Sequence, residues 1–105
     1  MDKEYVLNII SHFRKILEVK GITNNKIILY GSWAKGKQRE ESDIDLVVIS
    51  EDFKDKGYWE RIDILSDAIY EVFEPIEAIA MTPEEWEKGD TFMRGYTEDG
   101  EVINL

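Results

Sequence analysis

Two short apolar runs in the middle of this sequence constrain its possible folds more than any other feature. Residues 26–30 (KIILY) and 44–49 (IDLVVI) are rich in the branched side chains that favour strands, and turn-forming or polar residues bound each of them. Only about a dozen residues separate the two runs, which is enough for a short connection but not for a further long helix. We therefore predict two central strands in one small sheet.

Amphipathic helices are predicted before and after these strands. Apolar residues recur at helical spacing over residues 3–19, and Gly21 is a plausible stop. A second apolar face runs from Trp59 to Phe73 through Ile62, Leu65, Ile69 and Val72, and Pro75 ends it.

The remaining segments complete a short list of elements. Residues 76–81 predict a third strand, and Thr82-Pro83-Glu84-Glu85 is typical of a helix start with a reciprocal cap. We expect one helical turn and an exposed loop within 33–42, a polar connection over 51–57 and a short strand over 102–105. This order predicts an α/β fold (α+β in some schemes), in which a small mixed β-sheet carries packed helices.

Size and charge limit the possible functions. The chain has 105 residues, which fits a single domain over 1–105. Its net charge of −10 argues against general nucleic-acid binding, which needs a basic face. It has no cysteine, so disulfides and thiolate catalysis are excluded, and no run approaches the roughly 20 apolar residues of a membrane span. We expect a soluble cytoplasmic protein that does not contact a membrane.

Asp43 and Asp45 flank Ile44 at the mouth of the second strand. Because side chains alternate along a strand, both carboxylates are expected on the same face. Two carboxylates held so close repel each other, and a divalent cation such as Mg²⁺ relieves that repulsion. The alternative is two solvated acids at a strand end, since this sequence is rich in acids.

Gly31-Ser32 follows directly after the first strand. Glycine allows a sharp turn, and successive N–H groups at such a turn can bind a phosphate, to which Lys35 would add positive charge. The alternative is an ordinary turn with solvated lysines. Gly31 to Lys37 also matches most of a P-loop, but Gln38 replaces the required Ser or Thr and no room remains for the following helix, so we reject that interpretation.

Together the two features form a coupled motif. The stretch GSWAKG at 31–36, followed by SDIDLVV at 42–48, resembles the signature of the polymerase-β-like nucleotidyltransferase superfamily, in particular its minimal nucleotidyltransferase (MNT) family. The resemblance takes in the leading helix, the three strands and the Thr82 helix start. It implies a nucleotidyltransferase fold similar to the polymerase β palm.

The resemblance also implies roles for matching residues. Gly31, Ser32 and Lys35 would bind the triphosphate of ATP or another nucleoside triphosphate. Asp43 and Asp45 would hold two Mg²⁺ ions and act in catalysis together with a third carboxylate.

Glu77 matches the position of that third carboxylate. A charge among Ile76, Ala78 and Ile79 is costly to bury unless it is paired or metal-bound. The alternatives are that Glu77 lies on the exposed face of an edge strand, or that Glu74 takes its role. Two residues depart from the family pattern, because Lys37 stands where an acid is common and Glu77 where aspartate is commoner.

Three functions compete at this stage. The resemblance implies an enzyme that transfers a nucleoside monophosphate, with AMP as the expected group, to a hydroxyl of a protein partner, as MNT antitoxins do with HEPN-family toxins. The first alternative is a non-catalytic antitoxin that neutralises its partner by contact. The second is a small-molecule nucleotidyltransferase similar to those that modify aminoglycosides. The protein could form homo- or hetero-oligomers in any of these cases.

Overall fold

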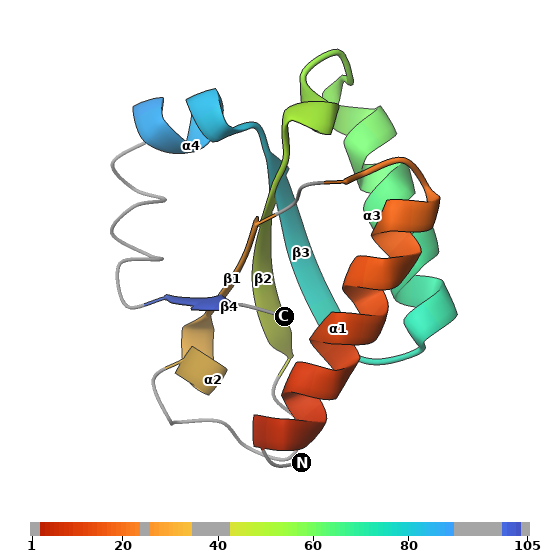
Figure 1. Cartoon of the computed structure of the whole chain (residues 1–105), viewed down its shortest axis with the longest axis vertical. Coiled ribbons are helices and arrows are strands. Elements are labelled where there is room, and N and C mark those ends of the chain that lie inside the picture. The colour runs from red at the N-terminus through yellow and green to blue at the C-terminus, as the bar shows by residue number, and fades with distance from the viewer. Residues whose placement is uncertain (1–2, 24–25, 35–42, 90–99, 104–105) are drawn as a thin grey trace.

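The computed structural model describes residues 3–23, 26–34, 43–89 and 100–103 (Figure 1). The elements in chain order are α1 (Lys3–Val19), β1 (Lys26–Tyr30), α2 (Gly31–Ala34), β2 (Ile44–Ile49), the 3-10 turn η1 (Glu51–Phe53), α3 (Tyr58–Val72), β3 (Ile76–Met81), α4 (Pro83–Lys88) and β4 (Glu101–Ile103).

The four strands form one sheet in the order β3-β2-β1-β4. β1 is antiparallel to both β2 and β4, whereas β2 and β3 are parallel. The predicted mixed sheet with packed helices is therefore confirmed. The terminal strand spans Glu101–Ile103 rather than 102–105, and residues 104–105 lie outside the described part of the chain.

Helices cover the two faces of the sheet unequally. In Figure 1 the long helices α1 and α3 lie on one side, and the short α4 lies on the other. Alternate strand residues such as Leu29, Leu46 and Val48 are fully buried against the long helices. Val47 and its neighbours form a smaller apolar cluster on the opposite face. Among the described helices, none is long and apolar enough to cross a membrane.

Two connections differ from the prediction. The short helix begins at Gly31 instead of near residue 33, because Gly31 has a φ of 73° and lets the chain turn directly out of β1. Residues 35–42, where the exposed loop was expected, lie outside the described ranges. The polar connection over 51–57 contains η1, in which Phe53 is fully buried.

The second long helix shows the largest correction. α3 spans Tyr58–Val72, close to the predicted range, and Leu65 and Ala68 are its buried residues. Trp59 and Phe73 were expected on the packed face, but their side chains are 73% and 84% exposed. Helical spacing identified an apolar stripe correctly, but its two ends turn away from the sheet.

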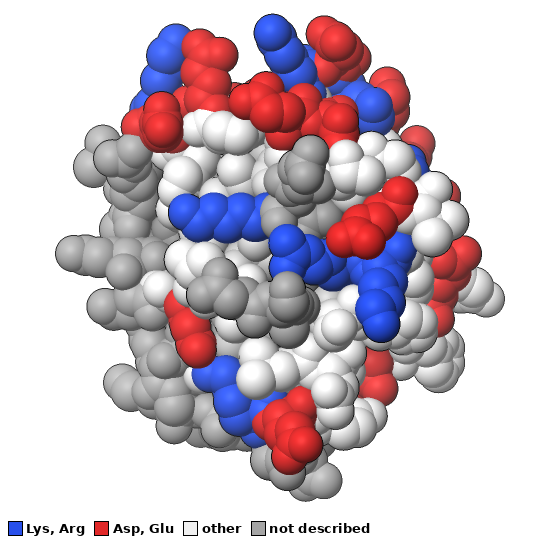
Figure 2. Space-filling view, viewed as in Figure 1, with Lys and Arg blue, Asp and Glu red and all other residues white. Residues whose placement is uncertain are grey.

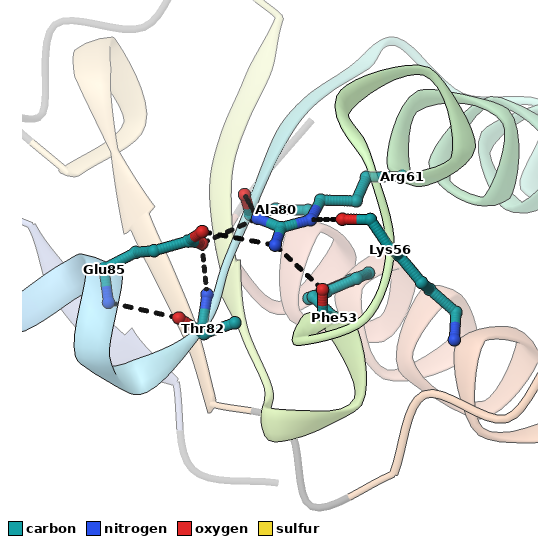
Figure 3. A network of polar contacts seen from close by, with 6 residues as sticks. All are labelled: Phe53, Lys56, Arg61, Ala80, Thr82 and Glu85. Atoms are coloured by element: carbon teal, nitrogen blue, oxygen red, sulfur yellow. Dashed lines mark hydrogen bonds and ion pairs between the residues drawn. The ribbon is translucent and has the colours of Figure 1, made fainter.

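A polar network around Arg61 joins α3 to the elements beside it (Figure 3). The Arg61 guanidinium lies 2.6 Å from Oε1 of Glu85 on α4, and it donates a hydrogen bond of 2.8 Å to the Phe53 carbonyl. Glu85 also accepts from the backbone N–H of Thr82, whose hydroxyl accepts in turn from the Glu85 N–H. The predicted reciprocal cap at Thr82 is therefore confirmed.

Candidate active site

The candidate acids meet at the end of the sheet where β1 passes into α2. Asp43 immediately precedes β2, and Asp45 is the second residue of that strand. In the strand register Asp45 lies opposite Tyr30 of β1 on one side and opposite Glu77 of β3 on the other. Gly31, the first residue of α2, follows Tyr30 directly. Four segments, β1, α2, β2 and β3, thus meet at one end of the sheet.

The acids lie on the less covered face of this sheet. Asp45, Val47 and Ile49 alternate along β2 on one face, as Glu77 and Ile79 do along β3. Val47, Ile49 and Ile79 belong to the apolar cluster on the α4 face, away from the long helices. The carboxylates of Asp45 and Glu77 therefore face a side of the sheet that α1 and α3 leave open.

Asp45 is half-buried and is electrostatically strained when ionised. Partial burial raises the pKa of Asp45 to about 6, and the nearby charge of Glu77 acts in the same direction. A hydrogen bond with Glu77 and the charge of Asp43 raise this pKa further. One proton shared between two carboxylates is the arrangement expected when like charges are held this close.

Gly31 makes this crowding possible. A Cβ at position 31 would overlap with the carboxylate oxygen Oδ2 of Asp45 and lie 3.1 Å from its Cγ. The positive φ of 73° also disfavours any residue with a side chain. Gly31 was predicted as a triphosphate contact. Its place in the structure adds a second requirement, which is room for the Asp45 carboxylate.

Other predicted residues are placed less fully. Ser32 lies within α2, but its side chain is outside the described set, and so is the whole of Lys35. Trp33, the next residue of α2, is only 3% exposed and packs in the main core. Glu74, the fallback for the third acid, accepts a hydrogen bond of 2.8 Å from the Tyr5 hydroxyl.

Glu77 takes one of the positions that the sequence left open. Its side chain is exposed on the edge strand β3, as the alternative to a buried or metal-bound position predicted. Its nearness to Asp45 comes from the pairing of β2 with β3. The residues around Glu77 carry no signal for that pairing. The order strand, helix, strand over residues 44–81 does, because two strands joined by a helix commonly lie parallel and side by side.

The acids present suit a hard divalent cation. Within the described residues, no three acidic or histidine side chains already form a complete metal-binding cluster. Mg²⁺, however, is typically held by one or two carboxylates together with substrate phosphates. The carboxylates of Asp45 and Glu77, with Asp43 beside them, supply hard oxygens, and a cation between them would relieve the repulsion that raises the pKa of Asp45.

Several solved structures share the fold of this chain at low sequence identity. One, described as a candidate nucleotidyltransferase, shares 23% identity, with 90% of this chain and 97% of that chain covered and a TM-score of 0.64. A candidate nucleotidyltransferase from Sulfolobus solfataricus shares 18% identity over 97% of this chain and 87% of that one, with a TM-score of 0.61. A toxin–antitoxin structure with AMP-PNP shares 20% identity over 91% and 70%, with a TM-score of 0.62.

The sequence itself identifies the family. No curated protein matches the chain. The family model described as "Nucleotidyltransferase domain" matches residues 10–93, which include both central strands, β3, α4 and all the candidate acids. The predicted superfamily and fold are thereby confirmed, and the chain belongs to the nucleotidyltransferase domain family.

Proposed function

We propose that this protein is a Mg²⁺-dependent nucleotidyltransferase that transfers AMP from ATP to a hydroxyl group of a protein partner. The observation that carries the proposal is the Asp45–Glu77 pair, which lies beside the Gly31 turn with Asp43 next to it. Family membership supports nucleotidyl transfer in general. The choice of AMP, of magnesium and of a protein acceptor is our proposal.

The chemistry would consist mainly of positioning and charge neutralisation, as in other phosphoryl transfers. Asp43, Asp45 and Glu77 would hold Mg²⁺, which supplies charge neutralisation at the triphosphate when bound. Gly31, Ser32 and Lys35 would hold the triphosphate itself. The acceptor hydroxyl attacks the α-phosphorus, its proton passes to the carboxylate of Asp45 or Glu77, and pyrophosphate leaves.

Two observations support a protein acceptor. Similar folds occur in a toxin–antitoxin structure with AMP-PNP and in a mutant of the MntA–HpeT toxin–antitoxin pair. The net charge of −10 also favours a basic partner over a nucleic acid. We therefore propose a HEPN-family toxin as the partner, in the cytoplasm, with residues 1–105 acting as one minimal domain.

Label transfer tests the proposal directly. The protein is incubated with Mg²⁺, α-labelled ATP and the protein encoded next to it, and the label on the partner is measured. We expect transfer by the wild type and by Asp55→Asn, an exposed acid in the turn after β2, and none by Asp45→Asn or with EDTA. Transfer that survives Asp45→Asn would place the chemistry elsewhere.

A binding measurement separates catalysis from neutralisation by contact. Calorimetry with a non-hydrolysable ATP analogue and Mg²⁺ should detect binding to the wild type and to Asp55→Asn, with little or none to Asp45→Asn. If Asp43→Asn/Asp45→Asn still neutralises the partner, the protein acts by contact and the enzymatic proposal is wrong.

A further inference from the structure

Aromatic side chains project from the solvent side of α3. Trp59, Tyr70 and Phe73 are 73%, 78% and 84% exposed, although side chains of this size usually lie in cores or at interfaces. Leu65 and Ala68 already bury the opposite side of the helix. The packing of this domain therefore does not account for the three rings.

Phe73 occupies a backbone position that favours glycine. It ends α3 in the left-handed conformation, with a φ of 59° and a ψ of 45°, and its N–H donates to the Ile69 carbonyl. Glycine or asparagine is usual at such a helix end, because other residues are strained there. Since the Phe73 ring is largely exposed, contacts within the fold do not offset that strain, which points to a role for the ring outside the fold.

Acidic residues surround the exposed rings. Glu60, Asp63 and Asp67 lie on α3 and are exposed. Arg61, the one basic residue of this helix, turns inward to Glu85 and does not neutralise them. In Figure 2 several acidic side chains lie along the right-hand edge of the molecule, on the side where Figure 1 places α1 and α3. The surface is thus apolar and negatively charged at the same time.

A groove of about 510 Å³ lies between α3 and the edge strand β3. Its apolar lining comes from both elements: Tyr58, Ile62 and Leu65 on the helix, and Ala78, Ile79 and Ala80 on the strand. The small alanine side chains leave room for an inserted group. The Arg61–Glu85 pair of Figure 3 forms part of the wall of this groove.

We propose that the exposed rings of α3 and this groove form a docking surface for a protein partner that presents apolar side chains flanked by lysine or arginine. The exposed aromatic residues supply the apolar contact, and Glu60, Asp63 and Asp67 supply the complementary charge. A second copy of this chain is disfavoured, because two such acidic faces repel each other at a net charge of −10 each. An anionic lipid surface is disfavoured for the same reason.

The exposed rings of α3 lie on the opposite side of the sheet from the candidate active site. α3 covers the sheet face opposite the α4 cluster, so a partner bound to α3 leaves Asp45 accessible. Phe73 lies only a few residues before Glu77, so the surface ends near the acids. The inference rests on the proposed function in placing a protein partner. It concerns binding alone, however, so it can fail while nucleotidyl transfer stands.

Binding of a model partner tests the surface. The probe is a labelled amphipathic helical peptide of leucine and lysine, and the same peptide with glutamate in place of lysine is the comparison. We expect the lysine peptide to bind, more weakly at high salt, and the glutamate peptide not to bind. Trp59→Ala/Phe73→Asn should weaken binding by about tenfold, the loss typical of contact residues at an interface centre. Asp63→Asn/Asp67→Asn should weaken it by a smaller factor.

Matched controls locate the effect. Val19→Ala removes an exposed apolar side chain from the end of α1, and Glu101→Gln removes an exposed acid from β4, at the opposite edge of the sheet from β3. Neither should alter peptide binding. Melting temperatures should show that Trp59→Ala/Phe73→Asn folds as well as the wild type, since the rings are exposed and asparagine suits the left-handed position.

Three outcomes would overturn the inference. The first is equal weakening by the control and α3 variants, which would indicate diffuse charge attraction. The second is unchanged binding by the α3 variants. The third is a wild-type dimer in sedimentation that Trp59→Ala/Phe73→Asn dissociates, which would assign the surface to a second copy. Tests of nucleotide transfer are unaffected by any of these results.

Discussion

Replacing Asp45 with asparagine is expected to stabilise the protein in the absence of divalent cations. Half-burial and the charge of Glu77 raise the pKa of Asp45 from 3.8 to about 6. A shift of about 2 pH units corresponds to roughly 3 kcal/mol. Because solvent reaches much of this carboxyl and screens it, we expect a net cost of only about 1 kcal/mol when it is ionised. Asparagine keeps the shape without the charge, so the melting temperature should rise by about 4 °C.

The stabilisation should depend on pH with a defined sign. Because the pKa of Asp45 is raised in the folded protein, the folded state binds the proton more tightly than the unfolded chain does. The contribution of Asp45 to the free energy of unfolding of the wild type therefore falls as the pH rises from 3.8 to about 6. The advantage of the variant is absent below this interval, grows within it and is complete above it.

Thermal unfolding followed by circular dichroism in EDTA measures this difference across the pH range. Asp55→Asn, the matched change of an exposed aspartate, should leave the melting temperature unchanged. Added Mg²⁺ should raise the melting temperature of the wild type more than that of Asp45→Asn. The reasoning is refuted if Asp45→Asn melts at or below the wild-type temperature near pH 8, or if its advantage persists at low pH.

Three further variants test the elements around the site. Gly31→Ala places a Cβ against the Asp45 carboxylate at a φ of 73°. We expect the free energy of unfolding in urea to fall by more than about 1 kcal/mol and Mg²⁺-dependent binding of an ATP analogue to be lost. Unchanged binding would contradict the close approach of Gly31 to Asp45. Arg61→Ala removes the ion pair with Glu85 and leaves the Phe53 carbonyl without its donor, so the free energy of unfolding should fall by about 2 kcal/mol. Arg61→Lys should recover part of this loss, whereas a loss under about 0.5 kcal/mol would contradict the network. Thr82→Ala removes the α4 cap and should cost about 1 kcal/mol, with Thr82→Ser nearly neutral in the same assay.

Much of the local structure was predictable because local sequence signals specify it. The helical periodicity of residues 3–19 matches α1, and the branched runs match β1 and β2. Thr82 and Glu85 form the reciprocal cap that their spacing predicts. The coupled motif at 31–48 also predicted the family, which the match over 10–93 confirms.

The predictions failed where one pattern allows two environments. An apolar stripe at helical spacing looks the same whether a sheet or a partner covers it, so Trp59 and Phe73 were assigned to the core although they face solvent. An acid between apolar residues is likewise buried in a central strand but exposed at an edge, and for Glu77 the sequence left both positions open. Glu77 lies on the edge strand β3, and its position there follows only from the strand order.

The sequence alone therefore determined the elements, their order and the residue types available for chemistry, because these depend on neighbours within a few positions along the chain. Only the tertiary structure decided that Glu77 lies opposite Asp45, that Gly31 leaves room for the Asp45 carboxylate, and that the ends of the α3 stripe face outward. Those features arise from contacts between distant segments. Strand register and helix packing set such contacts, and many local sequences are compatible with more than one arrangement.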